Sequence, residues 1–217
     1  MSDIFSEVDE EVRREQLKKL WERYGVFMIG ACVLLVVAVG GWRGYEWYQG
    51  KQAAEAGASF EAAIALSDQG KTKEAEEAFA KLSAGGPSSY RMLAKLREAA
   101  ALSQSDPKAA VPIYDQLAGD SRNGQSLQDL AALRAAMLLL DTDSYDEISR
   151  RLEPLTDQSR TFRHSARLTL ALSAWRAKNA TAMKRWTDMI IADAETPSGA
   201  RGQIQMLLAL SEADQKS

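Results

Sequence analysis

The pattern of apolar positions divides the chain into two unlike parts. Residues 24–42 read YGVFMIGACVLLVVAVGGW without a charged side chain, and Arg23 and Arg43 bound this run. Beyond Gly50, apolar residues instead recur three and four positions apart, in stretches separated by short turn signals. That spacing is typical of amphipathic helices. The pattern therefore predicts one continuously apolar helix, followed by a series of shorter helices that each have one apolar face.

The apolar run has the length of a single transmembrane helix. Its 19 residues, at ~1.5 Å each, extend about 28 Å, which is close to the roughly 30 Å hydrocarbon thickness of a bilayer. Tyrosines and tryptophans, whose rings prefer the headgroup layer, lie at both ends of the run. The predicted span comprises residues 24–42 and includes Tyr24, Val26, Cys32, Leu35, Val39 and Trp42.

Basic residues on either side of the span predict its orientation. Five lysines and arginines lie within residues 13–23, whereas only Arg43 and Lys51 follow the span closely. Because such an excess marks the cytoplasmic side, we expect residues 1–23 to be a charged cytoplasmic segment. This segment is either a short amphipathic helix or a solvated tail. Residues 43–55 are expected to be a helical connector next to the membrane, and the rest lies on the opposite side, which in a Gram-negative bacterium is the periplasm.

Two other interpretations of the N-terminal region stay open. Ala38, Val39 and Gly40 imitate the cleavage site of a signal peptide, although a signal peptide has a shorter basic region and a shorter apolar core. Arg13 and Arg14 resemble the start of a twin-arginine export signal, but charged residues interrupt the chain before the apolar run begins. A permanent membrane anchor fits the segment better than either.

A repeated spacing organises residues 56–217. A small residue is followed by a large one four positions later and by another large one seven positions later, and the motif recurs at intervals of 35, 38 and 34 residues. A period near 34 with this spacing is typical of the second helix of a tetratricopeptide repeat. Isoleucine replaces the small residue in the third copy. The four sets of packing residues are Ala75, Phe79 and Leu82; Ala110, Tyr114 and Leu117; Ile148, Leu152 and Leu155; and Ala182, Trp186 and Met189.

The predicted fold is all-α: a transmembrane helix, then an α-solenoid of about four degenerate tetratricopeptide-like hairpins. An amphipathic helix over residues 204–210 would cover the exposed end of the solenoid. Turn residues support the hairpins, because short polar side chains before a helix accept hydrogen bonds from its first N–H groups. The predicted helix caps are Thr72, Asp106 before Pro107, Ser126 with Asp129, Ser144 with Glu147, and Thr196 before Pro197.

Composition excludes several classes of protein. The chain has 27 Lys and Arg against 30 Asp and Glu, a formal net charge of −3, and a mean hydropathy of −0.30. These averages exclude a disordered tail and a multi-span membrane protein, and a near-neutral balance argues against a general nucleic-acid binder. One cysteine, Cys32, can form neither an internal disulfide nor a zinc site by itself.

Motifs for catalysis or for cofactor binding are missing from the sequence, so we expect a protein that is not an enzyme and that uses no cofactor or metal. His164 is the single histidine, and we expect it at the surface or in a groove rather than as a base. Trp175 and Trp186 either fill gaps between hairpins or anchor a bound peptide. Trp175 and Arg167 are the candidate protein-binding residues.

Two stretches of sequence carry a resemblance to a known family. Gly41-Trp42-Arg43 and Tyr45-Glu46-Trp47-Tyr48 follow the span, and Ser89 to Ala99 follows the first repeat. With the single span and the repeats, they resemble the bacterial ancillary subunit of the SecYEG translocon, an inner-membrane protein with a periplasmic tetratricopeptide-like domain. The resemblance implies Sec translocon subunits, periplasmic folding factors and exported polypeptides as partners, and a chaperone-like role. The main alternative is a scaffold for envelope assembly or cell division that binds one fixed partner; a membrane-bound hydrolase is a third, weaker hypothesis, because nucleophile and base are missing.

Overall fold

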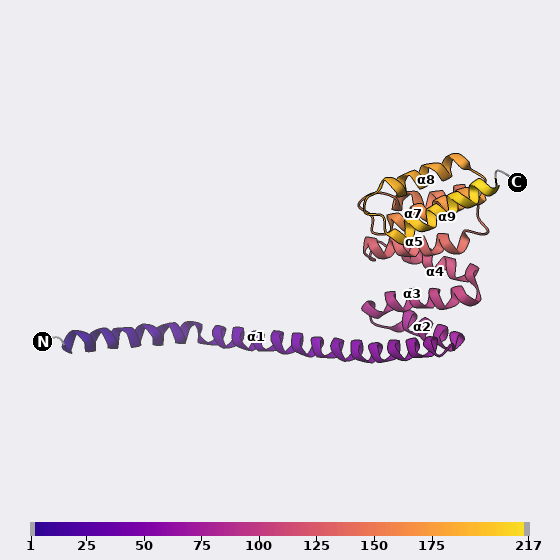
Figure 1. Cartoon of the computed structure of the whole chain (residues 1–217). Coiled ribbons are helices and arrows are strands. Elements are labelled where there is room, and N and C mark those ends of the chain that lie inside the picture. The colour runs from indigo at the N-terminus through magenta and orange to yellow at the C-terminus, as the bar shows by residue number, and fades with distance from the viewer. Residues whose placement is uncertain (1–2, 215–217) are drawn as a thin grey trace. The chain divides into compact units, whose positions relative to one another are not determined.

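The computed structural model describes the backbone of residues 3–214, and the side chains from Lys18 onward except those of residues 19, 20, 89 and 214. Most of the described residues are helical and none lies in a strand, which confirms the predicted all-α fold (Figure 1). In chain order the helices are α1 (Asp3–Asp68), α2 (Thr72–Gly85), α3 (Ser88–Ser105), α4 (Pro107–Gly119), α5 (Gln125–Leu139), α6 (Tyr145–Leu152), the 3₁₀ helix η1 (Glu153–Leu155), α7 (Arg163–Arg176), α8 (Ala180–Ala192) and α9 (Ser198–Asp214).

The chain divides into two units, one ending at Ala54 and the other beginning at Glu55. In the first unit α1 is helical from Asp3, so the described backbone of the charged segment is helical. The stretch that begins at Trp21 is long and apolar enough to cross a membrane. All six residues named for the predicted span have exposed side chains: Tyr24, Val26, Cys32, Leu35, Val39 and Trp42.

The second unit is built of helical hairpins that pack in chain order. The end of α1 and α2 form the first hairpin, in which the rings of Phe60 and Phe79 meet edge to face with centroids 5.5 Å apart. α3 with α4, α5 with α6, and α7 with α8 form the next three, and α9 packs against α7 and α8. The predicted four hairpins and capping helix are therefore present.

The core of the second unit follows the small–large–large spacing closely. The small residues Ala75 and Ala110 are fully buried, which lets neighbouring helices approach, and the aromatic residue one turn later fills the space between them. The buried members are Ala75, Phe79, Ala110, Tyr114, Leu117, Ile148, Leu152, Leu155 and Trp186. Leu82, Ala182 and Met189 are only partly buried. On α8 the fully covered stripe instead runs through Met183, Trp186 and Ile190.

Two of the predicted helix caps are confirmed. The Asp106 carboxylate accepts a hydrogen bond of 3.0 Å from the backbone N–H of Ala109, and Pro107 occupies the first turn of α4. The Ser144 hydroxyl accepts one of 3.3 Å from the N–H of Glu147 at the start of α6. Each satisfies a helix donor that has no partner within the helix.

Three predicted caps are wrong. Thr72 is already the first residue of α2, and no side chain caps that helix. Ser126 lies inside α5, whose preceding residue is Gly124. The Thr196 hydroxyl does not cap α9 but donates back to the carbonyl of Ile190, at 2.8 Å. Of the three, Thr196 shows that a short polar residue next to a helix start can make a hydrogen bond that local sequence does not distinguish from capping.

Candidate functional site

An apolar groove lies between α5, α7 and α9. Its volume is about 340 Å³, and most of its lining surface is carbon. Concave apolar surfaces of this size are the usual places at which proteins bind ligands or peptide segments. The lining residues are Met137 and Leu140 from the end of α5; Leu168, Thr169, Leu172 and Trp175 from α7; and Gln203, Met206, Leu207 and Leu210 from α9.

The groove is open to solvent, with several of its apolar lining residues exposed. Met206 is 67% exposed, and Met137 and Leu210 are each about half exposed. Apolar side chains that gather in one exposed place, rather than singly, mark interaction surfaces. Methionine is unbranched and polarizable, so its side chain adapts to partners of different shape.

Helix α7 shows why the sequence builds a groove here. Its residues Ala166, Leu170, Ala171 and Ala174 are buried in the core. Leu168, Leu172 and Trp175, spaced four and three residues apart, form a second apolar face, and it is this face that lines the groove. A helix that is apolar on two faces needs a second partner. The sequence carries this signal, but the interpretation of α7 as a repeat helix with a single apolar face missed it.

From the sequence alone, Trp175 and Trp186 could each either fill a gap between hairpins or anchor a bound peptide. The structure places the two side chains differently. Trp186 is completely buried; its indole N–H donates to the hydroxyl of Tyr145 at 2.9 Å, and the guanidinium of Arg185 lies 4.2 Å from its ring centroid. Trp175 is only partly buried and lines the groove. Of the two side chains, only Trp175 lies where a partner could contact it.

Arg167, a candidate protein-binding residue, belongs to an internal network instead. Its side chain is only 4% exposed. The guanidinium donates to the backbone carbonyl of Thr156 through Nε and Nη2, at 3.2 and 2.7 Å, and to Asp193 at 2.8 Å. These contacts tie α7 to the segment before it and to the end of α8. The protein-binding prediction for Arg167 is therefore corrected: its charge is used inside the domain.

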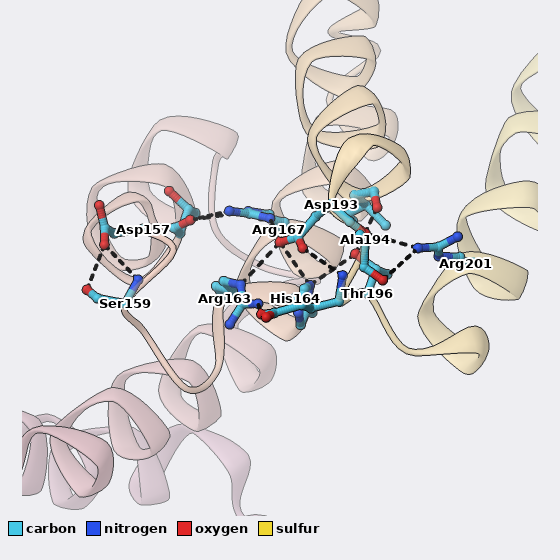
Figure 2. A network of polar contacts seen from close by, with 12 residues as sticks. Asp157, Ser159, Arg163, His164, Arg167, Asp193, Ala194, Thr196 and Arg201 are labelled. Carbon is cyan, nitrogen blue, oxygen red and sulfur yellow. Dashed lines mark hydrogen bonds and ion pairs between the residues drawn. The ribbon is translucent and has the colours of Figure 1, made fainter.

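Asp193 is the centre of this network, and Figure 2 shows side chains of α7 converging on it. Arg163 donates from Nε to the Asp193 carboxylate at 3.1 Å, besides the bond from Arg167. Burial acts to raise the pKa of Asp193, but the hydrogen bonds from Arg167 and Arg163 outweigh it and lower that pKa to about 2. The carboxylate is therefore ionised at any pH at which the domain works.

His164 packs into the same network. Its Nδ1 lies 3.2 Å from the Thr196 hydroxyl and 3.8 Å from the Asp193 carboxylate. Burial, together with the positive charge of Arg163, lowers the pKa of His164 below its usual value near 6.5, and the opposing attraction of Asp193 is weaker. His164 is thus a neutral, partly buried packing residue. No three His, Cys, Asp or Glu side chains in the described part of the chain are grouped as metal ligands.

We expect acid to destabilise the domain through His164. Since the histidine pKa is lower in the folded state, the unfolded chain binds more protons, and the free energy of unfolding should fall as pH drops below about 6.5. Above that pH the stabilisation is complete. Urea unfolding between about pH 7.5 and 5.5 should show this slope, and it should be weaker in His164→Gln. An equal slope in both proteins would contradict the assignment.

Stacked helical hairpins and an open apolar groove define a protein-interaction solenoid. Comparison with family descriptions agrees: residues 18–167 match the Tetratricopeptide repeat-like domain, and the chain belongs to that family. The match includes the apolar run as well as the first three hairpins. Comparison with curated proteins and with solved structures finds no match. Domains of this kind are typically non-enzymatic modules that bind other proteins.

Proposed function

We propose that this protein is a single-pass anchor of the bacterial inner membrane whose periplasmic repeat domain binds exported polypeptides at the Sec translocon. The groove between α5, α7 and α9 is the observation that carries the proposal. A chain that has just crossed a membrane is unfolded and exposes apolar segments, and an adaptable apolar groove suits such segments without demanding one sequence. The role is chaperone-like and needs no catalytic residue.

The exposed surface of α1 supports the anchor. Val26 is 82% exposed, and its apolar neighbours are similarly uncovered, which is favourable in lipid and unfavourable in water. At about 100° per residue, the aromatic residues at the end of the span point in different directions around the helix axis. Aromatic side chains on all sides of the helix suit a headgroup layer that surrounds it, whereas a protein partner would contact only one side of the helix. These exposed aromatics are Trp42, Tyr45, Trp47 and Tyr48.

Topology is the first test of the anchor. A reporter enzyme that is active only in the periplasm should be active when it is fused after Ser217, because the basic residues before the span favour the cytoplasm. The same reporter fused at the N-terminus should be inactive. Activity of a cytoplasm-specific reporter after Ser217 would contradict the proposed orientation. Release of the mature domain from membranes would favour the signal-peptide interpretation instead.

The groove is tested by site-specific crosslinking in cells. A photo-reactive residue in place of Gln203 should crosslink to translocon subunits and to exported chains. Adding Met206→Glu should lower the crosslinking yield about tenfold. A methionine that becomes buried under a bound segment contributes roughly 1.5–3 kcal/mol to the binding free energy, and glutamate would lose this contribution. Ile191→Glu is the matched control, because Ile191 is also exposed but lies outside the groove.

Two outcomes would count against this function. Equal crosslinking in Met206→Glu and Ile191→Glu would show that the groove is not the binding surface. Capture of one protein in constant ratio, with no exported chain and no translocon subunit, would favour the alternative scaffold for envelope assembly or cell division. Capture of periplasmic folding factors beside exported chains would support the chaperone-like role.

A further inference from the structure

The methionines of the described chain differ sharply in their exposure to water. Met137 and Met206 are exposed, and both line the apolar groove between α5, α7 and α9. Met28 is exposed as well, but it lies in the proposed span, where lipid surrounds it. The other described methionines are buried or partly buried: Met92, Met183 and Met189. The groove therefore holds the thioether sulfurs that a reagent dissolved in water reaches most easily.

A thioether sulfur is readily oxidised, and the product differs from methionine in polarity. With hypochlorous acid, the sulfur gains an oxygen atom and gives an electron pair to chlorine, which leaves as chloride together with one proton. The product, methionine sulfoxide, carries a polar sulfur–oxygen bond on a side chain that was apolar. Thiol-dependent reductases restore the thioether: the oxygen leaves as water, and a dithiol becomes a disulfide. The modification is thus reversible.

The groove has few groups that could pair with a sulfoxide oxygen once a partner covers it. Among the lining residues, only Thr169, Trp175 and Gln203 carry an N–H or O–H group on the side chain. The Thr169 hydroxyl already donates to the backbone carbonyl of Ser165, at 2.9 Å. In the free protein, water solvates the new oxygen. A bound apolar segment would displace this water, and the cost of covering an unpaired acceptor opposes binding.

We propose that Met137 and Met206 are sites of reversible oxidation by hypochlorous acid, and that their sulfoxides lower the affinity of the groove for apolar segments. The oxidation depends on exposure alone, whereas its effect on binding rests on the proposed function of the groove. Met137 comes from the end of α5 and Met206 from α9, so oxidation makes two walls of the groove polar. Neither side chain belongs to the buried core, so the fold is kept while binding is lost.

Peptide mapping by mass spectrometry tests the oxidation sites. The full chain in detergent micelles is treated with a substoichiometric amount of hypochlorous acid, and the oxidised fraction of each methionine is measured. Met137 and Met206 should be oxidised at least about fivefold faster than Met183 and Met189. Methionine sulfoxide reductases with a thiol reductant should reverse the modification. Oxidation of the buried methionines at the same rate as the two groove methionines would overturn the proposal.

Crosslinking from a photo-reactive residue at position 203 tests the effect on binding. A short exposure of cells to hypochlorous acid should lower the crosslinking yield about tenfold. Met137→Leu with Met206→Leu should keep the yield and remove this sensitivity, because leucine has a similar volume and cannot form a sulfoxide. Met189→Leu is the matched control, since it removes a partly buried methionine outside the groove and should leave the sensitivity unchanged.

The outcomes separate this proposal from the proposed function. An equal loss of crosslinking in the double leucine variant would overturn the effect of oxidation on binding, since the loss would then come from other targets of the oxidant. Changed circular dichroism of the oxidised protein would also count against it, because unfolding would then explain the loss. Absence of crosslinks before oxidation would contradict the proposed function, whereas the peptide map still decides the oxidation sites.

Discussion

Replacing Trp186 with alanine should lower the free energy of unfolding of the repeat domain by about 4 kcal/mol. Trp186 is among the largest fully buried side chains of the domain, and it packs in the core shared by α5 to α9. Its loss removes buried apolar surface and leaves a cavity that the surrounding helices fill only in part. The hydroxyl of Tyr145 also loses the indole donor.

A more conservative variant separates packing from hydrogen bonding. Trp186→Phe keeps most of the ring volume but removes the indole N–H, so it should lose clearly less stability than Trp186→Ala. Urea unfolding followed by circular dichroism measures both. If Trp186→Ala unfolded at the same urea concentration as the unaltered protein, the packing described for α8 would be wrong.

Replacing Arg160 with glutamine should cost about 3 kcal/mol of the free energy of unfolding. Arg160, in the connection before α7, donates to both oxygens of Asp129 on α5, at 3.1 and 3.3 Å. The Asp129 side chain is only 4% exposed. Without Arg160 the carboxylate stays buried with the amide of Gln125 as its remaining described partner, at 2.8 Å.

The matched control for this prediction is an exposed ion pair. Arg150→Gln breaks a contact with Glu147 in which both side chains are largely exposed, and it should change stability by less than about 1 kcal/mol. Adding Asp129→Asn to Arg160→Gln should recover part of the loss, because the double variant has no unpaired buried charge. Identical losses for Arg150→Gln and Arg160→Gln would contradict the burial of Asp129.

Much of the core could be predicted from sequence because it depends on local spacing. Phe79, Tyr114 and Trp186 each follow a small or branched residue by one helical turn, and each is buried. In the fourth repeat, however, the apolar face of α8 is wide enough that either of two neighbouring sets of positions could face the core. The structure covers Met183 and Ile190 more completely than their neighbours Ala182 and Met189, and nothing in the local spacing distinguishes the two choices.

The proposed binding groove is harder to predict from sequence, since it depends on contacts between residues that are distant along the chain. Trp175 was identified as a possible binding residue, but its neighbours Met137 and Met206 come from helices far apart in sequence. The internal role of Arg167 is hidden from the sequence for the same reason. Its partner Asp193 lies 26 residues away, and a charged side chain at one position of a helix does not show whether a carboxylate will meet it.

The chain-order packing of the hairpins has a consequence for how this domain is made. Nearly every helix contacts the helix before it and the helix after it along the chain, so few contacts depend on segments that are distant in the sequence. A domain of this kind can acquire structure progressively while its C-terminal part is still being synthesised or threaded through a pore. Its first hairpins can be ordered before the last hairpin and α9 have emerged, which shortens the time during which apolar helix faces lie open to aggregation and proteolysis.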